Sequence, residues 1–461
     1  MVSLWKEQSS YDTGTVGYII INTCLVFFMV PGLAFLYSGL ARRKSALSLV
    51  WGCLMAGCVG IVQWYFWGYS LAFSSTATNP FIGNLDSFGW RNVYGALDGA
   101  DYPEFAFAIF QNMFLCVTLA IIAGATAERG RLLPHMIFLF LWATVVYSPL
   151  CHWAWSPVGW AAKWGVLDFA GGGPVEIGSG FGGFVYSYFL GKRNETLLIN
   201  FRPHNVSLIA IGTAILWFGW LGFNGGTAIY PSLRALYAIM NSNITAAVAG
   251  MTWCVLDYRL EKKWSTVGLC SGLISGLVAA TPSSGNITLY GSLILGIVTG
   301  VVCNFSTGLK YLVGVDDALD ILAEHGMAGV VGLLFNAFFG ADWVIGMDGV
   351  TEHNGGFISH NYKQLYKQIA YIGATIGYTV VVTAILCTVI DKIPGLQLRA
   401  DKIVDSIGLD EDQIGEFAYD YIEVSNYQIP NEDEPAQPDE KLTGNSTSGN
   451  STVDKSTVSE H

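Results

Sequence analysis

The stretch GYIIINTCLVFFMVPGLAFLYS, residues 17–38, contains no Asp, Glu, Lys or Arg and is long enough to cross a bilayer as a helix. The residues before it are polar and acidic rather than basic, so we expect no cleavable signal peptide. A transmembrane helix needs about 20 mostly apolar residues. By that measure the sequence predicts eleven spans, near residues 17–38, 48–73, 105–127, 135–151, 171–190, 206–223, 233–256, 265–280, 288–305, 321–340 and 368–390.

The composition of the whole chain also indicates a polytopic membrane protein. Of its 461 residues, 52% are hydrophobic and 13% are charged, whereas soluble domains carry about 25% charged residues. This balance excludes an ordinary soluble enzyme. The nine cysteines are scattered and never spaced C-x-x-C. We therefore expect no disulfide framework, no metal site and no cofactor.

The net charge of −12 is confined to one end of the chain. Residues 401–461 hold 15 acidic and 3 basic residues, so the first 400 residues are neutral overall. A basic nucleic-acid-binding surface is excluded. Lys and Arg in the connecting segments predict the orientation. With the N-terminus outside, twelve of them lie on the inner side and six on the outer side, as the positive-inside rule requires.

The predicted spans and the charged end together divide the chain into three parts. We expect residues 1–390 to form a transmembrane domain, with its N-terminus outside. Residues 391–429 form a cytoplasmic region that still carries apolar residues, and we expect it to dock onto the bundle. Residues 430–461 are rich in Pro, Asp, Glu, Ser, Thr and Asn, a composition typical of a disordered tail.

The odd number of spans in each half predicts an internal repeat. Spans 1–5 and 6–10 would form two halves of opposite topology, because the second half starts on the other side of the membrane. Inverted repeats of this kind place their working residues near the midplane, at the interface between the repeats. The predicted fold is an all-α membrane bundle of eleven transmembrane helices, with two inverted five-helix repeats and a final helix.

Glu176 and His325 are ionisable residues inside predicted spans, where such a group costs about 2.5–3.5 kcal/mol at the bilayer centre. Glu176 has apolar neighbours and no partner one helical turn away, so its partner must come from another helix. His325 opens the corresponding run on span 10, and we expect the two to face each other. A lone histidine on an apolar helix is otherwise more often a structural residue. Asp168 precedes a glycine-rich helix start, where the simplest role is that of an N-cap.

Several aromatic residues gather on the predicted outer side. Phe110 and Phe114 are four residues apart and share a helix face, either for simple packing or for a ligand. Trp155, Trp220 and Phe223 lie near the outer ends of their spans. Aromatic faces attract a small cation by about 0.5–2 kcal/mol each. The segment from Gly178 to Gly183 matches G-x-G-x-x-G, but it lies inside an apolar span, so we reject a nucleotide site.

These segments resemble the Amt/Mep/Rh ammonium transporter family, and specifically its fungal methylammonium-permease (Mep) branch. The resemblance covers about residues 17–423. Its motifs, all in the family's order, are Pro31-Gly-Leu-Ala-Phe-Leu-Tyr-Ser-Gly-Leu, Ala127-Glu-Arg, Asp168-Phe-Ala-Gly-Gly, Trp217-Phe-Gly-Trp, Phe223-Asn-Gly-Gly, Asp316-Asp-Ala-Leu-Asp, His325-Gly and Ile414-Gly-Glu-Phe. The resemblance implies the ammonium transporter fold, a homotrimer in the plasma membrane with the C-terminus in the cytoplasm, ammonium and methylammonium as substrates, and a role in nitrogen uptake.

The resemblance also implies a role for single residues. The family's outer ammonium site corresponds to Phe114, Trp155 and the hydroxyl of Thr227, a position that is Ser in much of the family. Phe114 and Phe223 match the paired aromatic gate beneath that site. Asp168 matches the acid that supports cation recognition indirectly.

The pore histidines are where the sequence departs from most of the family. The family's pore usually contains two hydrogen-bonded histidines. His325 matches the second, while Glu176 replaces the first, as in fungal members similar to Mep1 and Mep3. The resemblance therefore predicts a pore proton relay made of Glu176 and His325 in place of the histidine pair.

Our interpretation is an electrogenic ammonium transporter that deprotonates its substrate and moves ammonia and the proton through a hydrophobic pore. Two alternatives stay open: an ammonium-sensing receptor that signals through its tail to cytoplasmic regulators, and an electroneutral gas channel of the Rh type. An intramembrane hydrolase is disfavoured, because the sequence has no H-E-x-x-H motif and no serine in a recognisable nucleophilic setting.

Overall fold

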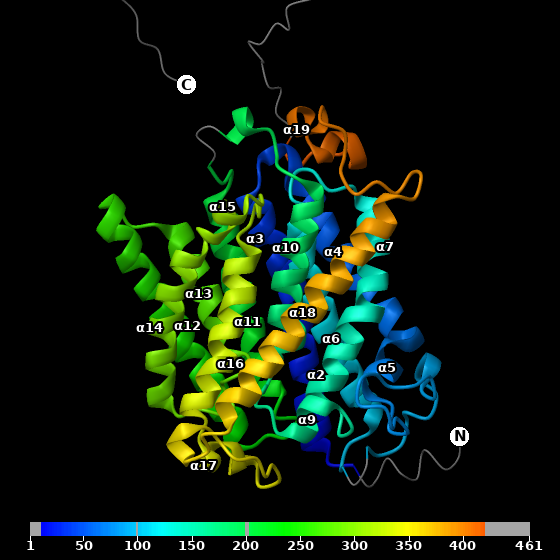
Figure 1. Ribbon diagram of the computed structural model, residues 1–461, viewed down its shortest axis with the longest axis vertical. Helices are drawn as coiled ribbons and strands as arrows, with labels where there is room; N and C mark the ends of the chain where they lie inside the picture. The colour runs from blue at the N-terminus through cyan, green and yellow to red at the C-terminus, as the bar shows by residue number, and fades with distance from the viewer. Residues whose placement is uncertain (1–10, 98–99, 199–201, 420–461) are drawn as a thin grey trace, which may run out of the picture. The chain divides into compact units, whose positions relative to one another are not determined.

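The computed structural model describes residues 11–97, 100–198 and 202–419, and all the named secondary-structure elements within these ranges are helical. Most of the long helices run roughly along one direction, as Figure 1 shows. The end of the predicted cytoplasmic region and the whole predicted tail, residues 420–461, lie outside the described residues.

Nine helical stretches of the described chain are long and apolar enough to cross a membrane. Several are interrupted by a turn or by a short π-helical segment and therefore carry more than one label. They are α2 with α3 (Thr13–Phe27, Met29–Leu40), α4 with α5 (Ala46–Gln63, Tyr69–Phe73), α6 (Glu104–Ala123), α7 with α8 and α9 (Leu132–Trp142, Ser148–Trp155, Trp160–Trp164), α11 (Val206–Gly226), α12 (Leu233–Glu261), α14 with α15 (Leu289–Ser306, Leu309–Val313), η9 with α16 (Leu322–Met327, Ala328–Phe339) and α18 (Gln364–Asp391).

The two remaining predicted spans are helical as well, but they do not meet the same criteria. One is η7 with α10 (Gly172–Ile177 and Gly178–Leu190), whose many glycines and whose Glu176 lower the mean hydropathy. The other is α13 (Thr266–Ala280), which has only 15 residues. Length and hydropathy therefore support nine spans and leave these two helices to be judged by their place in the bundle.

The helix α12 packs against both α13 and α14 through glycines of its two neighbours. A Cβ atom on Gly276 of α13 would lie 2.7 Å from the Cα of Ala246, and one on Gly296 of α14 would lie 2.7 Å from the Cβ of Val248. Both glycines belong to G-x-x-x-G segments, which let helix backbones approach closely in membranes. The small residues thus determine how closely these three helices pack.

The last long helix, α18, crosses α10 and α16 diagonally (Figure 1). Its Gln368 is fully buried and bonds to two segments that are far apart in the sequence. The amide nitrogen donates to the carbonyl oxygens of Leu167 (2.7 Å) and Leu333 (2.9 Å), and the amide oxygen accepts from the N–H of Leu167 (3.0 Å). One side chain therefore ties the segment before α10 to α16.

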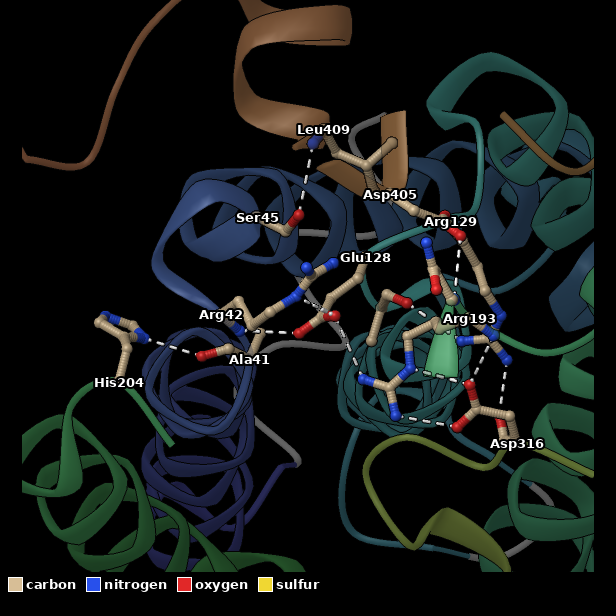
Figure 2. A network of polar contacts seen from close by, with 12 residues as sticks. Ala41, Arg42, Ser45, Glu128, Arg129, Arg193, His204, Asp316, Asp405 and Leu409 are labelled. Atoms are coloured by element: carbon tan, nitrogen blue, oxygen red, sulfur yellow. Dashed lines mark hydrogen bonds and ion pairs between the residues drawn. The ribbon is translucent and has the colours of Figure 1, made fainter. Parts of the chain in front are cut away.

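At the end of the bundle where α7 begins and α10 ends, buried ion pairs join the connecting loops (Figure 2). Glu128, fully buried, accepts from the Arg42 guanidinium at 2.6 Å and lies 3.2 Å from that of Arg193. Arg193 also forms a two-point contact with Asp316, at 2.8 Å for each oxygen. Burial alone would raise the pKa of Asp316, but the Arg193 charge and hydrogen bonds hold it well below its usual value.

The segment after α18 packs against this loop network. It contains α19 (Val404–Ile407) and η12 (Asp410–Ile414), and Figure 1 shows both at that end of the bundle. The Asp405 carboxylate accepts from Arg399 (2.9 Å) and from the backbone N–H of Asn194 (3.1 Å). The Asp410 carboxylate accepts from two backbone N–H groups in the first turn of α4, those of Leu47 (2.9 Å) and Ser48 (2.7 Å). Asp410 therefore caps a helix that is distant in sequence.

We expect Gly276→Ala to destabilise the bundle, because the added methyl group must push α12 and α13 apart, at about 1–3 kcal/mol for overpacking. Thermal unfolding of the detergent-solubilised protein would show a lower Tm. Gly373→Ala on α18 is the matched control, since nothing lies within 4 Å of a Cβ at that position. Equal Tm values for the two variants would contradict the close approach of α12 and α13.

We expect Asp410→Ala to loosen the segment after α18, because the start of α4 loses its cap, which is worth about 0.5–2 kcal/mol. Limited proteolysis of the purified protein should cut this segment faster than in the unchanged chain. Glu411→Ala serves as the control, since Glu411 is the exposed neighbour of Asp410. The same cleavage rate in both variants would argue against the cap.

Candidate functional site

Two interrupted helices, η7–α10 and η9–α16, pack closely at the centre of the bundle. Each begins with a π-helical segment of six residues, and such segments are often found at functional sites. A Cβ atom on Gly180 would collide with the backbone of Gly326, and one on Gly329 would lie 2.9 Å from the Cβ of Glu176. The glycines therefore allow the two helices to touch beside Glu176.

The side chains of Glu176 and His325 meet at this contact. Nδ1 of His325 lies 2.9 Å from Oε2 of Glu176, and the two side chains are 2% and 0% exposed. Within the described part of the chain, Oε1 of Glu176 has no hydrogen-bond partner. An uncommitted, buried carboxylate oxygen is costly and can accept a proton or a donor. The imidazole and the carboxyl can share one proton.

Asp168 holds the start of η7 in place. Its carboxylate accepts from the backbone N–H groups of Gly171 (3.1 Å), Gly172 (2.6 Å) and Gly173 (2.8 Å), and from the hydroxyl of Tyr371 on α18 (3.0 Å). A carboxylate that caps a helix start in this way satisfies donors that the helix itself leaves free. Asp168 therefore positions the segment that carries Glu176, eight residues further along.

The aromatic residues form a stack between α6 and α11. The rings of Phe114 and Phe223 are parallel within 22°, with centroids 3.8 Å apart, and both are fully buried. Phe110 and Trp155 meet Phe114 edge-on, at 5.0 and 6.1 Å. Trp220 lies 6.0 Å from Phe223. The predicted pair of Phe114 and Phe223 is thus a direct ring contact.

A cavity of about 510 Å³ opens beside this stack. Trp155, Asp168 and Thr227 line it, whereas Phe114 and Phe223 do not line it. The indole N–H of Trp155 donates to the carbonyl oxygen of Asp168 (3.2 Å), and the hydroxyl of Thr227 donates to that of Phe223 (2.8 Å). Because the hydroxyl hydrogen of Thr227 is used in the bond to Phe223, its oxygen is left to accept a hydrogen bond from a donor in the cavity.

Several residues of the site were not predicted from the sequence. Lys163, Arg234 and His353 also line the cavity, and Tyr371 bonds to Asp168. The three basic residues lie outside every motif that we identified, so no sequence pattern marks them. Tyr371 lies in a predicted span, where an aromatic residue carries no functional signal.

The described residues hold no group of three or more His, Cys, Asp or Glu side chains that could bind a metal ion. All nine cysteines are free.

Comparison with known proteins gives close relatives. A profile of the Ammonium Transporter Family matches residues 17–419. The chain is 69% identical over 431 residues to the ammonium transporter MEP1 of Saccharomyces cerevisiae, covering 93% of this chain and 88% of the relative. It is 68% identical over 423 residues to MEP3 of the same yeast, covering 91% and 86%. The names of these relatives describe transporters, which are not enzymes.

The fold agrees with solved structures of the same kind. The crystal structure of Saccharomyces cerevisiae Mep2 superposes with a TM-score of 0.81 at 46% sequence identity, covering 85% of this chain and 91% of that chain. The crystal structure of Candida albicans Mep2 gives a TM-score of 0.81 at 44% identity, covering 85% and 87%.

We expect Asp168→Ala to destabilise the protein and to reduce transport, because three backbone donors and a tyrosine hydroxyl lose their acceptor, at about 1–3 kcal/mol. Tyr371→Phe, which removes only one of the four hydrogen bonds, should have a smaller effect. Thermal unfolding in detergent and substrate uptake measure the two consequences. An Asp168→Ala variant as stable as the unchanged protein would exclude the capping role.

Proposed function

This chain belongs to the Ammonium Transporter Family, in its fungal Mep branch, and we propose that it conducts ammonium as separated ammonia and proton. Ammonium enters the cavity beside Trp155, Asp168 and Thr227 and passes the stacked rings of Phe114 and Phe223. It gives up its proton on the way. Ammonia then crosses the apolar bundle, and the proton travels through Glu176 and His325.

Selectivity follows from the cost of desolvation. A bare cation that enters a narrow apolar pore loses its hydration, and a few aromatic contacts of about 0.5–2 kcal/mol each cannot offset that loss. Potassium is similar in size to ammonium, so size alone cannot separate them. Loss of a proton can, because ammonium becomes a neutral molecule and potassium does not.

The observation that carries the proposal is the buried contact between Glu176 Oε2 and His325 Nδ1, at 2.9 Å, with Oε1 of Glu176 uncommitted. A carboxyl beside an imidazole can take up a proton on one group and pass it on from the other. One positive charge then moves in each cycle, and an inside-negative potential favours uptake by about 2.3 kcal/mol per 100 mV.

Glu176 also makes the pore lining more attractive to cations than two imidazoles would. We therefore propose faster transport, with weaker discrimination against potassium, than in relatives that carry two histidines. Methylammonium, which has the same acidic N–H groups, is the second substrate that we assign.

The arrangement in the membrane belongs to the same proposal. We assign eleven spans, counting η7–α10 and α13, in two inverted halves followed by α18. The N-terminus lies outside, and the end of the bundle that carries α19 is cytoplasmic, with the segment from residue 391 docked there. The basic residues Arg42, Arg129 and Arg193 at that end support this orientation. A homotrimer in the plasma membrane completes the assignment.

An ammonium-sensing receptor is the second candidate, because the Asp410 cap links the segment after α18, and through it any cytoplasmic regulator, to α4. A purified protein that binds ammonium in liposomes without transporting it would favour the receptor. An electroneutral gas channel is the third candidate, and uptake without current would favour it. A titratable pair buried in the centre of the bundle argues for charge movement.

We expect Glu176→Gln to lower the ammonium-evoked current by about 10²-fold or more, since a positioned proton-transfer group contributes at least that factor. Glu176→His should keep a current and improve discrimination against potassium. Proteoliposomes on a solid-supported membrane measure both quantities.

The control for this experiment is Glu104→Gln, which alters another buried carboxyl, hydrogen-bonded to Tyr69 on the same bundle. It should leave selectivity unchanged. Current and selectivity that stay unchanged in both Glu176 variants would remove Glu176 from the mechanism.

A further inference from the structure

The cavity that receives a cation in the proposed function is lined by three basic side chains. Lys163 comes from α9, Arg234 from the first turn of α12, and His353 from the loop after α17 (Asp342–Ile345). The acidic residue that lines the same cavity is Asp168. Basic groups at an entrance for ammonium oppose the substrate by Coulomb repulsion, so their presence there needs an explanation.

One of the three charges has a fixed partner. The Arg234 guanidinium forms an ion pair with Asp348 at 2.7 Å, and this pair is largely buried. The carboxylate of Asp168 carries one negative charge against the one positive charge of Lys163. With His353 neutral, the cavity and its ion pair therefore have no net charge. With His353 protonated, they carry one positive charge.

The loop that carries His353 is held in place by Arg234. Besides Asp348, Arg234 donates to the hydroxyl of Thr351 (2.9 Å) and to the backbone oxygen of Gly285 (2.9 Å). Its guanidinium also lies 4.9 Å from the ring of Phe169. Thr351 is two residues before His353, so these contacts hold the backbone next to His353, whose exposed side chain lines the cavity.

The surroundings of His353 make its charge depend on pH in the acidic range. Desolvation lowers the pKa of His353 below its usual value, Arg234 and Lys367 lower it further, and Asp348 opposes them. Lys163 and Asp168 face the same cavity, while Glu352, next in the chain, does not line it. Since the pKa is lowered, the imidazole is neutral at neutral pH and gains its proton only below its usual titration range.

We propose that Lys163 and His353 set the apparent affinity for ammonium by fixing the net charge of the outer cavity. The inference rests on the proposed function, in which ammonium enters through this cavity. A single charge within about 8 Å of the entering cation, in a partly aqueous cavity, changes its occupancy by about two- to tenfold. Lys163 lowers the affinity at every pH, and His353 lowers it further only in acid.

The test is the apparent KM for ammonium-evoked current in proteoliposomes at low ionic strength, at about pH 7.5 and about pH 5. Ammonium stays protonated at both values, so its concentration does not change. In the unchanged protein we expect KM to rise about two- to tenfold in acid. His353→Gln should show nearly the same KM at both pH values. Lys163→Gln should show a lower KM at both and keep the rise in acid.

Lys363→Gln is the matched control, because Lys363 is exposed near the same end but does not line the cavity. It should behave like the unchanged protein. The shifts in KM should also shrink at high ionic strength, where exposed charges are screened. A merely structural role for His353 would change the maximal current or the stability instead.

The proposal is overturned if His353→Gln keeps the full rise of KM in acid, or if Lys163→Gln leaves KM unchanged. Either result would leave the proposed function intact, because the current itself would persist. Loss of all ammonium-evoked current in the unchanged protein would instead contradict the proposed function.

Discussion

The buried contact between Glu176 and His325 is the constraint on which the rest of this structure depends. Two ionisable groups in an apolar bundle are costly unless each supplies the other's partner. They can meet only because glycines on η7–α10 and η9–α16 let two backbones touch. Asp168 and Tyr371 then fix the start of η7, so that the carboxyl of Glu176 stays at the contact. The polar centre is held by the packing around it.

Uncharged aromatic groups and charged groups lie in separate parts of the bundle. The stacked rings of Phe114 and Phe223, fully buried, have no charge of their own. The open cavity beside them is lined by the acidic Asp168 and by three basic side chains, so its net charge depends on their protonation. At the opposite end, Glu128, Arg193 and their partners neutralise one another in a network that joins the loops (Figure 2). Charged groups thus lie in two separate places, the cavity and the far end of the bundle, with uncharged aromatic rings between them.

Much of the fold was predictable from the sequence, because a bilayer demands about 20 apolar residues from each span. The exceptions have physical reasons. The glycines of α10 and the Glu176 beside them lower the hydropathy of that segment, and α13 is short. Four site residues were recognisable in the sequence as polar groups in or next to apolar spans or as an aromatic group on a helix face: Glu176, His325, Asp168 and Phe114. The sequence led us to expect that Glu176 and His325 face each other, but the 2.9 Å distance between them depends on packing between helices and could not be derived from it.

The place of Lys163 and His353 in the site could not be predicted from the sequence, for a related reason. They lie in connecting segments, and the Arg234–Asp348 ion pair, together with the hydrogen bond from Arg234 to Thr351, holds the loop of His353 beside the cavity. A sequence pattern records neighbours along the chain, whereas this ion pair joins residues far apart in it. Residues in such loops can be assigned to a cavity only from the three-dimensional structure.

The buried amide of Gln368 has a consequence for how transport can proceed. It joins Leu167, in the segment before η7, to Leu333 on α16. A rocking motion of one half of the bundle against the other would break these bonds in an environment without water to replace them. Alternating access by rigid-body rocking is therefore an expensive route for this protein. The transport rate should depend on small side-chain movements along a permeation path that stays in place, as in a channel.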